Sequence, residues 1–361
     1  MNRTTFYFLT ILALILAACT PAGAPGTPSP AVEATSPPAG PRTLTVMTHD
    51  SFAASEEVIR AFEQENNATV RILKSGDTGS ALNRAILSRD NPLADIFYGV
   101  DNTFLSRALA EDIFEPYASS LLAEIPDAFK LDPENRALPV DYGDVCLNYD
   151  RAYFEGGDPP PPQNLEDLLA PEYGGLLVVQ NPATSSPGLA FLLATIGHFG
   201  EQGYLDFWQG LVENDVLVVN DWNTAYYSEF TVHGGSRPLV VSYGSSPPAE
   251  VVFAEQPLEE APTGAVIGGE SCFRQIEFAG ILSGSANRDL AERWIDFMLS
   301  PAFQEDMPLQ MFVFPVNPHA QLPEVFVEHA RLPETTAMVG HDEIAANRER
   351  WIQAWTETVL R

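Results

Sequence analysis

The chain has 361 residues, with 19 Lys and Arg against 49 Asp and Glu, and a formal net charge of −30 at pH 7. This acidity argues against nucleic-acid binding, which needs a basic surface, and against attachment to anionic lipid by charge. It suits a cationic or neutral ligand, although an acidic surface also serves solubility alone.

The first residues are typical of a bacterial signal peptide. Arg3 precedes an apolar run over 6–18 that is too short to span a bilayer comfortably. The run ends in Leu-Ala-Ala-Cys, the pattern of the lipobox, in which Cys19 is lipidated and becomes the first mature residue. We therefore expect a lipoprotein signal peptide over 1–19 and a membrane anchor at Cys19. The alternative is an ordinary signal peptide with a chance cysteine.

A tether is expected next, over 20–42. This stretch is dominated by Pro, Ala, Gly, Ser and Thr and has almost no large apolar residue. It cannot bury enough surface to offset the entropy of ordering, and its prolines keep it semi-extended. No later apolar run is long enough to cross a bilayer.

The remaining residues, 43–361, are numerous enough for two lobes. Apolar periodicity predicts strands at 44–48, 70–73, 94–100, 176–180, 216–219, 239–243 and 275–282. It predicts helices at 55–66, 77–87, 102–110, 188–198, 204–213, 290–299, 301–307 and 347–360. This alternation is the signature of an α/β fold with a mostly parallel sheet.

Two segments are expected to carry the chain between the lobes. Residues 137–150 are extended and aromatic, and residues 275–282 look like a return crossing. We therefore assign 43–140 with 275–361 to lobe 1 and 141–274 to lobe 2. Ligands of such sheets bind beyond the strand ends, and two lobes joined by crossing strands can close as a hinge on a central cleft.

The motifs do not indicate an enzyme or a resident metal. There is no HExxH motif, CxxC pair, GxSxG elbow or P-loop, so ATP hydrolysis would belong to another subunit. Adjacent Tyr226 and Tyr227 would suit ferric ion, but a helical segment would point them about 100° apart. Cys146 and Cys272 lie in strand-like segments, and either a disulfide or two buried thiols fits them.

Several segments carry a family resemblance in combination. They are LTVMTHDSF (44–52), the loop at 77 with Leu-Asn-Arg (82–84), ADIFYGVDN (94–102), VDYGDVCLNYD (140–150), NPATSSPG (181–188), DWNTAY (221–226), VSYGSSP (241–247), SPAFQ (300–304) and FPVN (314–317). From 44 to 361 the chain resembles the thiamine-binding subunits of bacterial ABC transporters. The resemblance implies the two-lobe type II periplasmic-binding-protein fold, thiamine or thiamine phosphate as ligand, permease and ATPase subunits as partners, no cofactor, and a monomer.

The resemblance also implies a ligand site. Asp77 would pair with the aminopyrimidine, Ser185 would hold the tail beside a helix start, and Trp222 and Tyr243 would line the same end and the ring edge. Asp77 could instead be a helix N-cap, Ser185 a turn residue, and Trp222 and Tyr243 packing residues. The remaining candidates are Thr78, Tyr226 and Ser246, with Asp101 and Asp141 as weaker ones.

Three positions depart from the family pattern. His49 stands where the family often has tyrosine, Ala249 near another tyrosine, and Phe312 near a tryptophan. Two of these replacements keep a flat ring and Ala249 does not, so the aromatic sandwich is thinner or is completed by another residue such as Tyr142. The departures leave open thiamine phosphates, a pyrimidine precursor or a different cationic heterocycle.

Overall fold

The computed structural model describes residues 40–361. The predicted signal peptide, Cys19 and nearly all of the predicted tether therefore lie outside the described residues. In the described part, no helix is both long and apolar enough to cross a membrane. The first strand begins at Arg42, the last residue of the predicted tether, and the Arg42 guanidinium binds the Asp289 carboxylate through two contacts of 2.8 Å.

The predicted strands and helices are present, with shorter elements between them. The strands are β1 (Arg42–Thr48), β2 (Ala68–Lys74), β3 (Ile96–Asp101), β4 (Phe114–Glu115), β5 (Leu138–Asp150), β6 (Leu177–Gln180), β7 (Leu217–Val219), β8 (Leu239–Tyr243), β9 (Thr263–Val266), β10 (Phe273–Leu282) and β11 (Phe314–Pro315). The helices are α1 (Glu56–Asn66), α2 (Thr78–Leu87), α3 (Leu105–Ala110), α4 (Ser186–Glu213), α5 (Trp222–Thr224), α6 (Pro247–Val252), α7 (Arg288–Leu299), α8 (Pro301–Gln304), α9 (Met307–Gln310), α10 (Glu324–His329) and α11 (His341–Val359). Two predicted helices, 188–198 and 204–213, form the single α4, which is kinked at Gly200.

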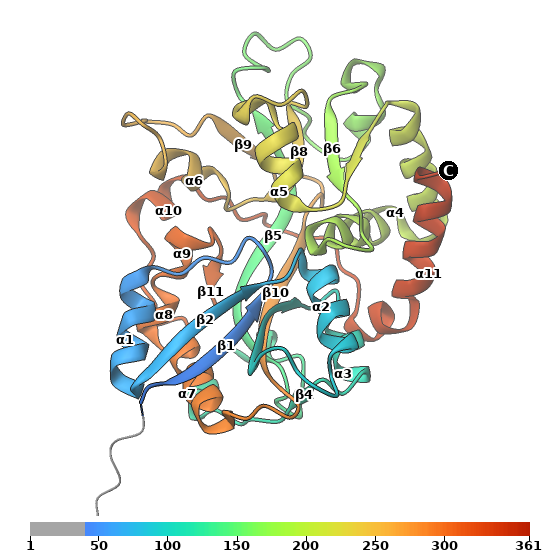
Figure 1. Cartoon of the computed structure of the whole chain (residues 1–361). Coiled ribbons are helices and arrows are strands. Elements are labelled where there is room, and N and C mark those ends of the chain that lie inside the picture. The colour runs from blue at the N-terminus through green and yellow to red at the C-terminus, as the bar shows by residue number, and fades with distance from the viewer. Residues whose placement is uncertain (1–39) are drawn as a thin grey trace, which may run out of the picture. The chain divides into compact units, whose positions relative to one another are not determined.

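The strands form one mixed sheet in the order β2-β1-β3-β10-β5-β8-β6-β7, with β4, β9 and β11 paired alongside (Figure 1). The strands pair in parallel at the two ends of this order, β2-β1-β3 and β8-β6-β7. The centre is antiparallel, because β10 pairs with β3 and β5, and β5 pairs with β8. The prediction of a mostly parallel sheet was therefore wrong, because the two long crossing strands, β5 and β10, pair antiparallel with each other and with their outer neighbours β8 and β3.

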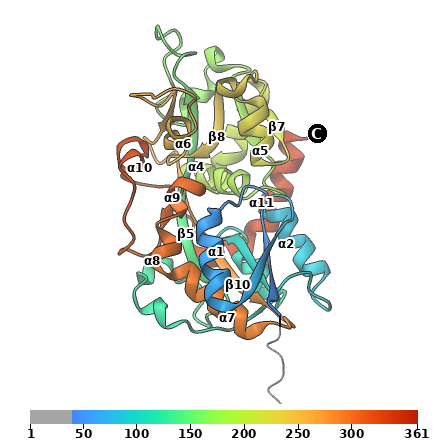
Figure 2. The same cartoon turned by 60° about the vertical axis from the view of Figure 1, so that its left-hand side comes forward.

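The long strand β5 links the two ends of the sheet. Its residues up to Val145 pair with β10, and those from Val145 to Tyr149 pair with β8. Figures 1 and 2 show β5 running from the group of β1, α1 and α7 to the group of β8, α4 and α5. These observations agree with hinge crossings in this region, while the predicted lobe boundaries stay a prediction.

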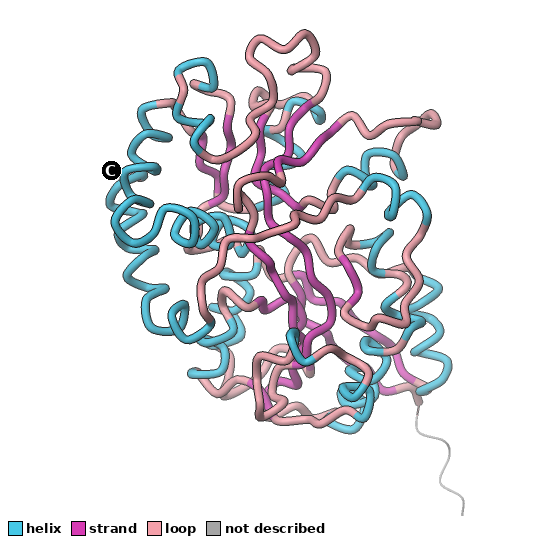
Figure 3. The backbone as a smooth tube through the Cα atoms, turned by 180° about the vertical axis from the view of Figure 1, so that it is seen from behind, coloured by secondary structure: helices cyan, strands magenta, loops and turns pink. Residues whose placement is uncertain are grey.

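Alternating side chains on the first strands explain how helices cover both faces of the sheet. Leu44 and Val46 of β1 lie in one apolar cluster with Trp294 of α7. Met47 of β1 lies in another cluster, together with Leu82 of α2. Successive residues of the strand therefore face opposite helical layers. Figure 3 shows the backbone from behind, with helices on either side of the strands.

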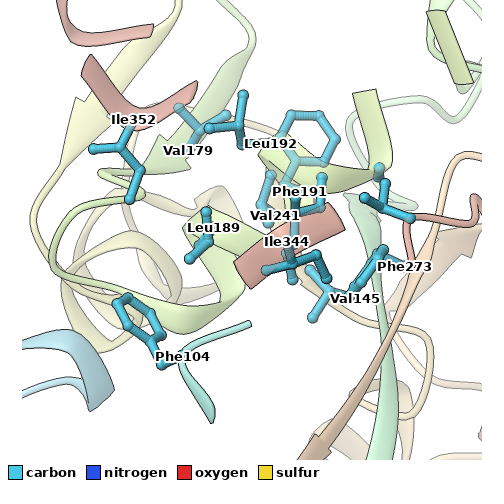
Figure 4. Packing of buried hydrophobic residues seen from close by; sticks show 14 of the residues in the cluster. Phe104, Val145, Val179, Leu189, Phe191, Leu192, Val241, Phe273, Ile344 and Ile352 are labelled. Carbon is cyan, nitrogen blue, oxygen red and sulfur yellow. The ribbon is translucent and has the colours of Figure 1, made fainter. Parts of the chain in front are cut away.

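The second cluster continues across to α4 and α11. Figure 4 shows Phe104, Val145, Val179, Leu189 and Val241 packed in one apolar region. The last helix belongs to this region, with Trp355 at 5.4 Å from Trp208 of α4 and the Arg348 guanidinium 5.0 Å over the Phe104 ring, measured to ring centroids. Helix α11 thus contacts segments that the sequence assigned to both lobes.

The structure joins Cys146 of β5 and Cys272, the residue before β10, in a disulfide with an S–S distance of 2.12 Å. Both cysteines are fully buried. The bridge closes a loop between residues 126 positions apart, and that loop contains β6, α4, β7 and β8. It therefore ties the two crossing strands together where the chain passes between the two groups of elements.

Candidate functional site

A cavity of about 260 Å³ lies beyond the ends of β1 and β8 and beside β10. Its volume is near the lower end of the range for ligand pockets, roughly 300–1,000 Å³, which suits a small solute. Its wall includes these predicted site residues: His49, Asp77, Thr78, Trp222, Tyr226, Tyr243, Ser246 and Phe312. Among the described residues, no Lys or Arg lines it, whereas the carboxyl groups of Asp77 and Glu277 do. The wall is therefore aromatic and acidic.

Asp77 combines two of the roles that the sequence left open. Its carboxylate caps α2 by accepting from the Thr78 amide at 2.7 Å. The other oxygen accepts from the Trp222 amide at 3.1 Å. Burial raises the pKa of the Asp77 carboxyl, while these two amides oppose the shift. Asp77 is thus both a helix N-cap and a cavity carboxyl that contacts the far side of the cleft.

Trp222 and Tyr226 form a stacked aromatic wall. Their ring centroids are 4.8 Å apart at an interplanar angle of 18°. The Trp222 indole N–H donates to Ser242 Oγ at 3.1 Å, and the Tyr226 hydroxyl donates to Glu250 at 2.8 Å. Both rings are held from behind, so the wall is rigid before a ligand arrives.

The tyrosine pair lies on a single π-helical turn over Ala225–Glu229. Tyr226 is buried and Tyr227 is 52% exposed, and their rings meet edge to face at 5.3 Å between centroids. Burial raises the pKa of the Tyr226 phenol well above its ordinary value, and the nearby Glu250 carboxylate raises it further. Without a bound cation, Tyr226 is therefore held as a neutral phenol that donates to Glu250.

Tyr243 closes another side of the cavity at the end of β8. Its hydroxyl donates to Gln275 Oε1 at 2.5 Å, and its backbone amide donates to Ser246 Oγ at 3.2 Å. Gly143 on the neighbouring β5 makes this possible, because a Cβ there would come within 2.8 Å of Tyr243 Cδ1. Tyr243 combines the two roles that the sequence left open, because it packs at the end of a strand and also lines the cavity.

His49 follows directly after β1 and packs over Gly99 of β3. Gly99 has a φ of +98°, and a Cβ at this position would overlap His49 Cδ2. Burial lowers the pKa of the His49 imidazole, and the nearby Asp77 and Asp141 carboxylates oppose this shift. The imidazole Nε2 lies 3.3 Å from Glu277 Oε1.

Glu277 is a cavity residue that sequence reasoning missed. It lies on β10 and is buried, and its carboxyl accepts from the Tyr98 hydroxyl at 3.0 Å. Burial raises the pKa of Glu277 to about 8, helped by the nearby Asp101 carboxylate. The sequence signal that could have identified Glu277 is the alternation of side chains along a strand. In the predicted return crossing, now β10, every second residue faces the same side of the sheet.

Two predicted acidic residues lie behind the wall. Asp101 accepts from the Thr103 hydroxyl at 2.8 Å, and burial raises its pKa to about 6. Asp141 accepts from the Tyr98 hydroxyl at 2.6 Å, and burial together with the Glu277 carboxylate raises its pKa well above the ordinary value. Neither residue lines the cavity, but both belong to the hydrogen-bond network behind it.

Ser185 and Tyr142 also lie outside the cavity wall. The neighbouring Ser186, first residue of α4, lines the cavity in place of Ser185. Ser185 Oγ is buried beside the Asp77 carboxyl, and its hydroxyl opposes the rise in the pKa of Asp77 that burial causes. Tyr142 stacks between Phe129 at 4.8 Å and Phe314 at 5.4 Å, so its ring is committed to packing.

A second missed residue, Phe253, stands at the mouth of the cavity. It follows α6, one helical turn after Ala249, and both residues line the cavity. The Phe253 ring is 71% exposed and meets the Phe312 ring edge to face at 5.6 Å between centroids. Phe312 has a φ of +55°. These two rings narrow the entrance from opposite segments of the chain.

Comparisons with known proteins identify the family to which the chain belongs. Residues 91–347 match the model of a family described as bacterial extracellular solute-binding protein. The chain belongs to this family. Members bind solutes outside the cytoplasm, so the chain has a binding role and acts outside the cytoplasm. The fold class and family expected from the sequence are confirmed.

The chain is similar to a thiamine-binding periplasmic protein of Escherichia coli, with 32% identity over 325 residues, 88% of this chain and 94% of the relative. A solved structure of a periplasmic thiamin binding protein superposes with a TM-score of 0.78 and 29% identity, covering 89% of this chain and 97% of that one. A ferric binding protein from Campylobacter jejuni has a TM-score of 0.71 and 20% identity, covering 87% and 99%, and therefore shows the shared fold alone.

Proposed function

We propose that this solute-binding protein captures thiamine and delivers it to the permease of an ABC importer, whose ATPase is a separate subunit. The observation that carries the proposal is the cavity wall, which combines stacked aromatic side chains with two carboxyl groups and, among the described residues, contains no Lys or Arg. Thiamine has a flat aminopyrimidine ring and a permanently cationic thiazolium ring. Aromatic faces and carboxylates are the groups that recognise such a ligand.

Individual residues suit distinct parts of this ligand. The Asp77 carboxylate would accept from the aminopyrimidine, and the Trp222 and Tyr226 stack would offer a flat face. Tyr243 and His49 would flank the rings from the strand ends, while Phe312 and Phe253 would cover the entrance. Phe253 lies one helical turn after Ala249 and would supply the aromatic ring that Ala249 lacks.

The form of the ligand follows from the charge of the wall. The hydroxyl groups of Thr78, Ser186 and Ser246 line the cavity, but Thr78 already donates to the Gly99 carbonyl and Ser186 to Thr78. A phosphate would find few free donors and would face two carboxyl groups without a Lys or Arg partner among the described residues. We therefore propose that unphosphorylated thiamine binds more tightly than thiamine phosphate, and the phosphate more tightly than the diphosphate.

Ferric ion is a weaker alternative. Tyr226, Tyr227 and His49 all line the cavity, as an iron site would need. However, Tyr226 donates to Glu250 and is stacked on Trp222, so it is committed to other partners. In residues 40–361, no group of three or more His, Cys, Asp or Glu residues is placed to hold a metal ion.

Two further proposals concern the membrane anchor and the closure of the two lobes. We propose that Cys19 is lipidated and that residues 20–42 tether the folded part to the membrane. We also propose that the cleft closes between lobe 1 (43–140 with 275–361) and lobe 2 (141–274). Contacts across it, such as Gly79 N–H to the Thr184 carbonyl at 3.1 Å, support a closed arrangement. A Cys19→Ser variant should lose the lipid from its N-terminal peptide, as measured by mass spectrometry, and should leave the membrane fraction.

The decisive test is calorimetric titration of unfolded and refolded protein with thiamine, thiamine phosphate and thiamine diphosphate. Saturable one-to-one binding in that order of affinity supports the proposal. A folded protein that binds none of the three refutes it. A visible tyrosinate-to-iron absorption band on adding ferric citrate would establish the alternative instead.

A further inference from the structure

Three buried carboxyl groups lie side by side behind the cavity, on three neighbouring strands. Glu277 of β10 pairs in register with Asp101 of β3 on one side and with Asp141 of β5 on the other. Asp101 and Asp141 are fully buried, and Glu277 is 6% exposed. Directly opposed residues of neighbouring strands point to the same face of the sheet, where like charges repel. All three groups therefore cannot be ionised together in the empty protein.

The hydrogen bonds around these three carboxyl groups allow one of the groups to be protonated. The single hydroxyl of Tyr98 lies 2.6 Å from Asp141 Oδ2 and 3.0 Å from Glu277 Oε2, so it can donate fully to only one of them. Asp141 Oδ1 has no hydrogen-bond partner within the described residues. A proton on one of the two carboxyl groups removes the repulsion and restores a donor, as in other close carboxyl pairs.

The groups facing Glu277 from each packed element are mostly acidic or neutral. They are His49 after β1, Asp77 before α2, Tyr98 and Asp101 on β3, Asp141 on β5 and Tyr243 on β8. His49 is the only basic side chain among them within the described residues, and burial lowers its pKa, which favours the neutral imidazole. The Arg348 guanidinium acts on Asp101, at one end of the row, but among the described residues no fixed cation faces Glu277 itself. Of the three carboxyl groups, Glu277 alone also lines the cavity.

We propose that Glu277 holds a proton in the empty cavity and releases it when a cationic ligand enters, so that capture of the cation is coupled to release of one proton. The carboxyl O–H bond breaks, the proton leaves to solvent, and the ligand cation takes its place beside the new carboxylate. The charge inside the cavity is thereby conserved. This inference rests on the proposed function for the identity of the cation, and it assigns to Glu277 the role of titrating counter-ion.

The test is titration calorimetry of the protein with thiamine at pH 7 in two buffers of different ionisation enthalpy, phosphate and Tris. The difference in heat gives the number of protons exchanged, which should be close to one for the wild type and close to zero for Glu277→Gln. With the pKa of Glu277 at about 8, thiamine affinity should also rise up to about 50-fold from pH 6 to pH 8, and this rise should vanish in the variant.

Two controls keep the result interpretable. Asp77→Asn alters the other cavity carboxyl and should weaken binding while still releasing a proton. If Glu277→Gln fails to fold, the wild type can be titrated with thiochrome, a neutral planar oxidation product of thiamine, which should bind without releasing a proton. The glutamine should be tolerated, because a neutral amide replaces a carboxyl that is already mostly protonated at pH 7 and can still accept from Tyr98.

The outcomes separate this inference from the proposed function. Thiamine binding without proton release, together with unchanged pH dependence in Glu277→Gln, would overturn the inference and leave the thiamine assignment standing. Equal proton release with thiamine and thiochrome would overturn it as well. Failure of the wild type to bind thiamine at any pH would refute the proposed function, and with it this coupling.

Discussion

Replacing Asp77 by asparagine should weaken thiamine binding while leaving the fold intact. The carboxylate accepts from the Thr78 amide at 2.7 Å and from the Trp222 amide at 3.1 Å. Asparagine has one acceptor oxygen, so it can cap α2 nearly as well, but its amide group would then face the Trp222 N–H donor against donor. The aminopyrimidine would also lose its charged acceptor, and losing one hydrogen bond to a charged group, about 1.5–3 kcal/mol, should raise the Kd roughly 10- to 150-fold.

The assay is titration calorimetry at pH 7.5, with urea unfolding as the measure of stability. Because the cap is retained but the Trp222 amide loses its acceptor, the free energy of unfolding should fall by about 1–3 kcal/mol, which leaves the protein folded. Asp50→Asn is the matched control, since Asp50 accepts from the Gly76 amide at 2.8 Å in the neighbouring loop but does not line the cavity. If Asp77→Asn binds thiamine as tightly as Asp50→Asn does, Asp77 is a helix cap and not a ligand residue.

Four further changes have definite expected outcomes. Trp222→Phe should weaken binding about tenfold and abolish ligand-induced quenching of tryptophan emission, because a smaller ring replaces the indole that we propose stacks on the ligand. Unchanged quenching would contradict this placement. Phe253→Ala should weaken binding by a similar factor with an unchanged Tm, since the ring is 71% exposed; a fall of several degrees would show a packing role. Replacing Cys146 and Cys272 by serine should cost about 2–5 kcal/mol in urea unfolding, and a cost below about 1 kcal/mol would argue against the bridge. Glu277 should make the empty protein more stable near pH 5 than near pH 9. Its folded pKa is raised to about 8, so the stability that it contributes below its unfolded pKa is lost as the pH rises through 8. Glu277→Gln should flatten this dependence of the free energy of unfolding on pH.

The sequence predicted the regular elements better than their pairing. Periodicity located β1, α1, β2, α2 and β3 within a few residues, because each has one face against a continuous core. It did not reveal that β10 runs antiparallel to β3, since strand direction depends on long-range pairing that leaves no local pattern. Two-residue strands such as β4 and β11 are too short to carry a period at all.

The site was predicted where a motif marked it and missed where only geometry defines it. Asp77 and Trp222 lie in segments that the family resemblance singled out, and both line the cavity. Glu277 carried no signal beyond strand alternation, and Phe253 lies one turn beyond the position at which the aromatic ring was expected. Tyr142 shows the converse limit, because its aromatic character did not distinguish ligand stacking from packing against Phe129.

The buried carboxyl row also illustrates why composition alone could not reveal the site's electrostatics. The net charge of −30 predicted an acidic surface, but Asp101, Asp141 and Glu277 are buried and held together by strand register. Only the paired strands place these side chains next to one another. Their raised pKa values are therefore a consequence of the fold rather than of the overall charge.

Calorimetric titration of the refolded wild-type protein with thiamine at pH 7.5 is the most direct test of whether the cavity binds thiamine. The aromatic and acidic cavity predicts saturable binding at one thiamine per chain, with weaker binding of thiamine phosphate and weaker still of the diphosphate. A well-folded protein that shows no binding heat and no change in Tm with excess thiamine would contradict the claim and leave a solute-binding protein for a different ligand.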